Sequence, residues 1–65
     1  MNDMVFDLNY NPVWCNTPAS CREWLRKRLK TDQTVGQYKV RRHQDLKHVS
    51  VATYLGDRSD SRHQG

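Results

Sequence analysis

The spacing of the apolar residues changes near residues 31–33, and this change constrains the fold more than any other feature of the chain. From Pro18 to about Lys30 there is neither a glycine nor a β-branched residue, which favours a helix. Beyond the change, residues alternate with the two-residue period of a strand over 38–43 and again over 48–53. A helix followed by two strands predicts a fold of the α+β class.

Thr17 and Pro18 form a helix start signal. The threonine hydroxyl can accept a hydrogen bond from a free backbone N–H, and proline at the first position lacks only a donor that would have no partner. Within the helix an apolar stripe spans an arc of about 140°, and its members are Cys21, Trp24, Leu25 and Leu29. Arg28 points into this stripe, so we expect its stem to lie along the core or its guanidinium to meet Asp3 or Asp7.

The two alternating segments predict a hairpin with its turn near residues 44–45. In an antiparallel pair joined by an even-length loop, even-numbered residues of one strand share a face with odd-numbered residues of the other. Tyr38 and Val40 are therefore expected on the core face with Val49 and Val51. The opposite face is expected to carry Lys39, Arg41, His48 and Ser50.

A further short strand is predicted over residues 4–8, with Met4, Phe6 and Leu8 on one face, and residues 9–12 are predicted to be the turn after it. The element order is then β-α-β-β, a small α+β domain over residues 1–55 with one helix packed on a short, largely antiparallel sheet. Residues 56–65 contain no apolar side chain, so we expect them to form a disordered polar tail.

The small size of the chain limits the chemistry that it can support. With 65 residues, of which 35% are hydrophobic, the core is small and a deep substrate pocket is not expected. Glycine-rich phosphate loops and the common hydrolase motifs are missing from the sequence, so we predict no enzymatic activity and no cofactor. There is no apolar run of membrane-spanning length and no signal-peptide pattern at the start, which predicts a cytoplasmic protein without membrane contact.

The positive charge is concentrated in the middle of the chain. The whole sequence has a net charge of +4, whereas residues 17–48 hold nine Lys and Arg against three acidic residues, a net charge of +6. This asymmetry favours DNA or RNA as the partner of a small regulatory protein. The predicted binding residues form a helix ridge and a hairpin face: Arg22, Arg26, Lys30, Lys39, Arg41 and Arg42. The alternative is that these side chains only solvate two exposed faces.

Trp14, just before the helix start, favours protein binding as the alternative to nucleic-acid binding. A sheet this small has exposed edges, and an edge can pair with a strand of another protein. The protein would then be a binding module or inhibitor that docks on a larger host protein through Trp14 and a sheet edge. The same surface could join two copies into a homodimer, and the plainer alternative is that Trp14 covers the end of a thin core.

Two cysteines and two histidines supply the residue types of a zinc site: Cys15, Cys21, His43 and His48. The histidine spacing suits a zinc finger, but five residues separate the cysteines where two to four are usual. Cys21 also belongs to the apolar stripe, whereas the histidines flank a predicted turn. We therefore predict that no metal is bound and that Cys21 is a core residue.

Overall fold

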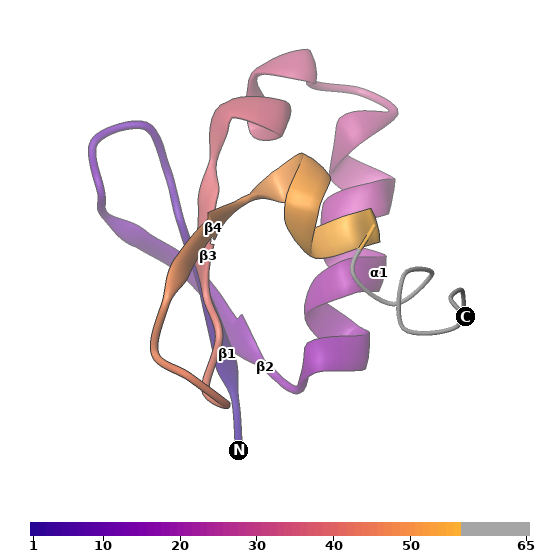
Figure 1. The fold of residues 1–65 in the computed structure, drawn as a ribbon. Helices are drawn as coiled ribbons and strands as arrows, with labels where there is room; N and C mark the ends of the chain where they lie inside the picture. Colours follow the sequence, from indigo (N-terminus) through magenta and orange to yellow (C-terminus); the bar gives the residue numbers. More distant parts are fainter. Residues whose placement is uncertain (57–65) are drawn as a thin grey trace.

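A computed structural model describes residues 1–56. Of the polar tail predicted over residues 56–65, Gly56 is helical, and residues 57–65 lie outside the described residues. The described chain forms a four-stranded antiparallel sheet with its helices on one side (Figure 1). The elements are β1 (Asp3–Phe6), β2 (Pro12–Asn16), α1 (Pro18–Leu29), the short 3₁₀ helix η1 (Gln33–Gln37), β3 (Lys39–Arg41) and β4 (His48–Ser50). Residues 51–56 are helical as well. The α+β class is confirmed, but the predicted β-α-β-β order lacked one strand and this final helix.

The helix α1 begins and packs as predicted. The Thr17 hydroxyl accepts a hydrogen bond from the Ser20 backbone N–H at 3.3 Å, and Pro18 is the first helical residue. Cys21 and Leu25 are fully buried, while Trp24 and Leu29 pack beside them. The guanidinium carbon of Arg28 lies 4.7 Å from the centre of the Trp24 ring, so of the two arrangements expected for Arg28 the pairing with Asp3 or Asp7 is not formed.

The predicted hairpin register is confirmed, but its second strand ends early. Val40 lies opposite Val49, and Lys39 lies opposite Ser50. The chain then turns into a helix because the Ser50 hydroxyl accepts a hydrogen bond from the Thr53 backbone N–H at 3.2 Å, as a helix N-cap does. The predicted strand therefore ends at Ser50, three residues short of the alternating pattern.

The strand that the sequence reading missed is β2. The turn before it is held by the Asp7 carboxylate, which accepts hydrogen bonds from the backbone N–H groups of Asn9 at 2.8 Å and Asn11 at 3.0 Å. Pro12 then begins β2, which a proline can do on an edge strand because it has no N–H to donate to a ladder. β2 pairs with β1 and forms one edge of the sheet.

The core lies between the sheet and the helices. Seven side chains are buried to within 1% of full coverage: Val5, Cys21, Leu25, Val35, Val40, Val51 and Tyr54. Val5 lies opposite Val40 in the sheet, so Met4 and Phe6 share the face that points away from the core. Leu8 lies in the turn after β1 and does not share that face as predicted.

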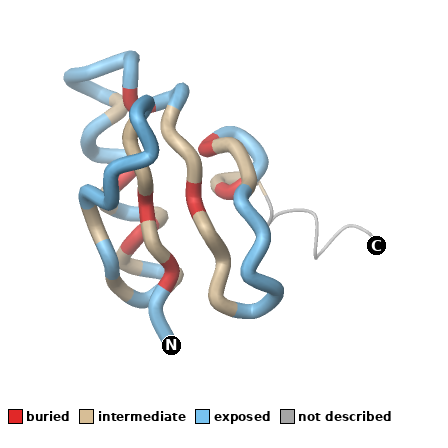
Figure 2. Tube along the Cα trace, turned by 90° about the vertical axis from the view of Figure 1, so that its left-hand side faces the viewer, coloured by how far each residue is buried: buried red, intermediate tan, exposed pale blue. Residues whose placement is uncertain are grey.

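One face of the sheet therefore has no described helix packed on it. Residues from α1, from η1 and from the 51–56 helix all belong to the one core cluster, on the same side of the sheet. Figure 2 views the sheet from the side that faces away from the helices, with the strands in front and the helices behind. Among residues 1–56, no helix combines the length and the apolar character needed to cross a membrane.

Candidate nucleic-acid interface

The exposed side of the sheet, called the outer face below, is built by alternation along the strands. Because Val5 and Val40 are fully buried, their neighbours in β1 and β3 point the other way. On β1, β3 and β4 the outer face consists of Met4, Phe6, Lys39, Arg41, His48 and Ser50. Sequence analysis predicted the β3 and β4 members of this set, whereas the contribution of β1 was not assigned to the same surface.

Basic and aromatic side chains interleave on the outer face. Lys39 lies between Phe6 on β1 and Ser50 on β4, and Arg41 lies between Met4 and His48. The rings of Phe6 and His48 are 5.5 Å apart, inclined at 51°. Phe6, Lys39 and Arg41 are all half-buried, so their backbones are fixed by the sheet while their side chains still reach solvent.

The positive charge of the outer face is not neutralised within the described chain. The ion pairs among residues 1–56 are Lys27 with Glu23, Arg42 with Asp45, and His43 with Asp3. None of them includes Lys39 or Arg41. No position of the outer face is a carboxylate, since Asp3 on β1 points into the core and is 2% exposed. The outer face therefore carries the two cationic side chains Lys39 and Arg41 and no carboxylate.

The other predicted basic residues do not join the outer face. Arg22 and Arg26 lie on α1 and Lys30 is its C-cap residue, and α1 packs on the opposite side of the sheet. The Arg22 guanidinium carbon stacks 4.8 Å from the centre of the Tyr54 ring, so this side chain is held against the protein. Arg42, directly after β3, donates to Asp45 at 2.7 Å. Of the six predicted residues, Lys39 and Arg41 are the two that lie on the outer face.

Trp14 lies on the edge strand β2, half-buried, and stacks on Trp24 of α1 with 5.3 Å between ring centres and an angle of 11°. Its indole Nε1 is buried and has no hydrogen-bond partner among the described residues. The two tryptophans, with Ser20, Glu23 and Lys27, line a shallow pocket of about 250 Å³. Trp14 therefore covers one end of the core and also borders a recess beside a free sheet edge.

Among the described residues, no metal site is formed by the four residues considered as a zinc set: Cys15, Cys21, His43 and His48. Cys21 is buried, and its Sγ donates weak hydrogen bonds to the carbonyl oxygens of Asn16 at 3.4 Å and Asp3 at 3.6 Å. Burial raises the pKa of this thiol. Cys15 is exposed on β2, and both cysteines are free. Within residues 1–56 no three His, Cys, Asp or Glu side chains are arranged to hold a metal ion.

A buried polar cluster links residues that are far apart in the sequence. The Asp3 carboxylate accepts hydrogen bonds from the His43 backbone N–H at 3.0 Å and from the Tyr54 hydroxyl, and the His43 Nδ1 lies 2.7 Å from it. Burial alone would raise the pKa of Asp3, but these hydrogen bonds outweigh burial and hold the pKa below its ordinary value. Burial and the bond to Asp3 raise the pKa of Tyr54.

The His43 ring belongs to this Asp3 cluster: within the described chain, its hydrogen bonds involve Asp3 and neither thiol. The sequence gives no local sign of the cluster because Asp3 and His43 are separated by 40 positions.

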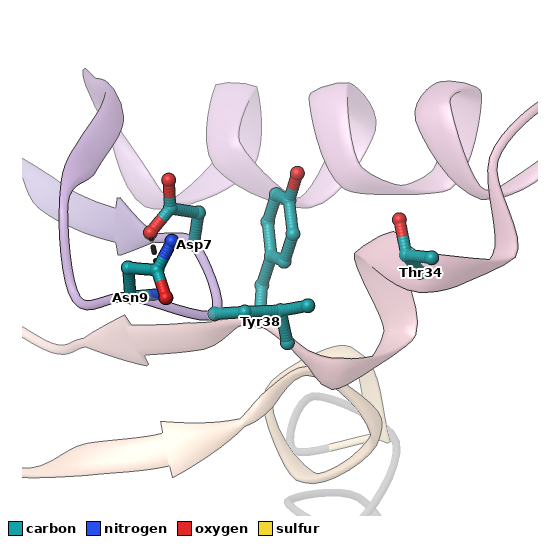
Figure 3. A pocket seen from close by; sticks show the side chains of 5 residues that line it. Asp7, Asn9, Thr34 and Tyr38 are labelled. Carbon is teal, nitrogen blue, oxygen red and sulfur yellow. Dashed lines mark hydrogen bonds between the residues drawn. The ribbon is translucent and has the colours of Figure 1, made fainter.

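A second shallow pocket, of about 200 Å³, lies between the β1–β2 turn and η1 (Figure 3). Two of its polar side chains already have local partners, since Asp7 accepts from the Asn9 backbone N–H and the Thr34 hydroxyl donates to Asp32 at 2.6 Å. The Tyr38 ring stands between Asp7 and Thr34 in Figure 3 and packs against the core, as predicted. Tyr38 is therefore not a stacking residue of the outer face.

Comparisons with known proteins add no relative: no protein-family model, curated protein or solved structure matches this chain.

Proposed function

We propose that the protein is a small, non-enzymatic regulatory protein that binds nucleic acid through the outer face of its sheet. One observation carries the proposal: Lys39 lies beside Phe6, and Arg41 lies between Met4 and His48, on the outer face. This face has no carboxylate, and no described helix covers it. Lysine and arginine on such a face can neutralise phosphates, which is the main source of affinity for nucleic acid. The basic ridge of Arg22, Arg26 and Lys30 lies on the other side of the sheet from the outer face. It would therefore contact a second segment of nucleic acid or none.

Two matched double variants test the surface. Lys39→Gln with Arg41→Gln removes two positive charges from the outer face, and Arg26→Gln with Lys30→Gln removes two from α1 and its C-cap. We expect the first variant to weaken binding of a labelled oligonucleotide in fluorescence anisotropy. Its slope of log affinity against log salt should fall by about 1.4–1.8, as expected for two lost phosphate contacts. The second variant has the same net charge and should bind nearly as well as the wild type.

Equal losses in the two variants would show that net charge, not the outer face, provides the affinity. Absence of binding to DNA and RNA at low salt would refute the proposal altogether. Circular dichroism of both variants should match the wild type, because all four side chains reach solvent and contribute little to the core.

A second candidate function is favoured by the position of β2. This strand is an edge of the sheet, carries no charged residue and presents Val13 at 40% exposure beside the Trp14 pocket. Uncharged edges of this kind can pair with a strand of a host protein or of a second copy. Val13→Lys should block such pairing. Pull-downs after nuclease treatment test for a host protein, and sedimentation velocity tests for a dimer, each with the wild type and with Val13→Lys. If the wild type forms no complex in either experiment, this candidate function is refuted.

A further inference from the structure

Phe6 places an aromatic ring on an inner strand of the basic outer face. β1 lies between β2 and β3, so Phe6 is flanked by strands on both sides. Lys39 lies directly opposite Phe6, and the His48 ring is 5.5 Å from the Phe6 ring. An aromatic ring beside cationic side chains on an open sheet is the arrangement on which an unpaired base stacks, with its phosphates held nearby.

The width of the sheet argues against insertion into duplex DNA. A two-stranded ribbon fits the major groove, which is about 12 Å wide. The β3–β4 hairpin is not such a ribbon, because β3 also pairs with β1. Four strands spaced by about 4.8 Å span about 14 Å between the axes of the outermost two, before side chains are added. The outer face is therefore too wide for the groove, whereas a single strand can lie across it.

The spacing of the basic residues suits a single strand as well. Lys39 and Arg41 are two positions apart on β3, so their backbones are separated by about 6.8 Å along the strand. Their side chains can therefore hold two phosphates of one extended strand, on either side of a base that lies over Phe6. His48, exposed beside Phe6, completes the aromatic side of the platform.

We propose that the outer face binds single-stranded nucleic acid, with one base stacked on Phe6 and with Lys39 and Arg41 holding the adjacent phosphates. This inference rests on the proposed nucleic-acid-binding function and narrows it to unpaired strands. The shared chemistry of single-stranded DNA and RNA is a stackable base on a phosphate backbone, so both belong to the predicted ligand class.

The first experiment compares three fluorescein-labelled ligands of one mixed sequence: single-stranded DNA, single-stranded RNA and the blunt duplex. We expect either single strand to bind at least 10-fold more tightly than the duplex at equal salt. Preference for the RNA strand would indicate contact with the 2′-hydroxyl, and equal affinity would indicate stacking and phosphate contacts alone. A duplex that binds as tightly as both single strands overturns this inference but leaves the proposed function standing. No binding of any ligand overturns both.

The second experiment changes the ring. Phe6→Leu keeps an apolar side chain but removes the stacking surface, and we expect single-strand affinity to fall about 5-fold or more with an unchanged salt slope. Phe6→Tyr retains a ring and should bind like the wild type. Tyr10→Leu is the matched control, because Tyr10 is an exposed aromatic residue at 64% exposure in the β1–β2 turn. Unchanged affinity in Phe6→Leu, or an equal loss in Tyr10→Leu, would refute stacking on Phe6.

A third measurement needs no variant. On addition of the single strand to the wild type, the Phe6 ring protons should move upfield in the NMR spectrum, as expected for a ring under a stacked base. Inorganic polyphosphate, which has charge but no base, should leave them in place. Absence of the upfield shift with a bound single strand would contradict the proposal even if Phe6→Leu does not fold.

Discussion

Asp3 is the buried carboxylate that joins both ends of the described chain to the β3–β4 turn. Asp3→Asn removes the charge that strengthens its bonds to His43 and Tyr54, so we expect the free energy of unfolding at neutral pH to fall by about 1.5–3 kcal/mol. Because the pKa of Asp3 is lowered in the folded state, its stabilisation is present above the ordinary value of 3.8 and is lost as pH falls through the folded value. Urea denaturation of both forms between neutral and acid pH measures this.

Glu23→Gln is the control for Asp3→Asn. Glu23 is exposed on α1 and pairs with Lys27 across 3.5 Å in solvent, so its loss should change stability by less than about 0.5 kcal/mol. The difference between wild type and Asp3→Asn should shrink below pH 3.8. A difference that stays constant down to pH 2 would mean that the charge of Asp3 does not stabilise the fold.

Leu46 adopts a left-handed backbone conformation in the β3–β4 turn, with φ of 58°, and its side chain is 67% exposed. This conformation is strained for leucine and unstrained for glycine. Leu46→Gly should therefore raise the free energy of unfolding by about 0.5–1 kcal/mol, after the entropy cost of glycine. Leu46→Ala keeps the Cβ and should give no gain in thermal or urea denaturation. Equal behaviour of the two variants would attribute any gain to the lost leucine side chain instead.

At the scale of elements, α1 depends on its cap. Thr17→Ala leaves the Ser20 backbone N–H without its side-chain acceptor and should lower stability by about 1 kcal/mol. Thr17→Ser retains the hydroxyl and should stay near the wild type. The comparison is made by urea denaturation, and a Thr17→Ser loss as large as that of Thr17→Ala would attribute the effect to packing of the threonine methyl.

The elements with local signals could be predicted from the sequence. Thr17-Pro18 and the apolar stripe mark α1, and parity alone places Val40 and Val49 on the same face of the hairpin. β2 has no comparable signal, because its pairing with β1 depends on contacts across a turn closed by the Asp7 side chain. The 51–56 helix follows alternating β-branched residues, and its only local signal is the capping hydroxyl of Ser50.

The candidate site was predictable only in part, for the same reason. Alternation in the hairpin is enough to place Lys39 and Arg41 on one face. The position of Phe6 beside them depends on β1 pairing with β3, a contact between segments more than 30 residues apart. Likewise, the sequence alone cannot show that α1 turns Arg26 and Lys30 away from the hairpin.

At the scale of the whole molecule, the chain has a net charge of +4, and its basic side chains lie on both sides of the sheet. Lys39 and Arg41 lie on its outer face, while the basic ridge of α1 lies on the other side. A partner that binds the outer face therefore experiences only part of the basic charge of the chain. For this reason the distribution of charge between the two layers, rather than its total, decides which surface a polyanion occupies.

The stability of the whole molecule depends on the last described helix. Val51 and Tyr54 are two of the seven fully buried side chains, and Tyr54 also bonds Asp3. Loss of a buried aromatic residue alone costs about 3–5 kcal/mol, which is comparable to the entire stability of about 3–5 kcal/mol available to a domain of this size. A chain ending at Ser50 should therefore be unfolded, whereas one ending at Gly56 should melt cooperatively in far-UV circular dichroism. A cooperative transition in the shorter chain would show that the sheet and α1 form a stable unit without this helix.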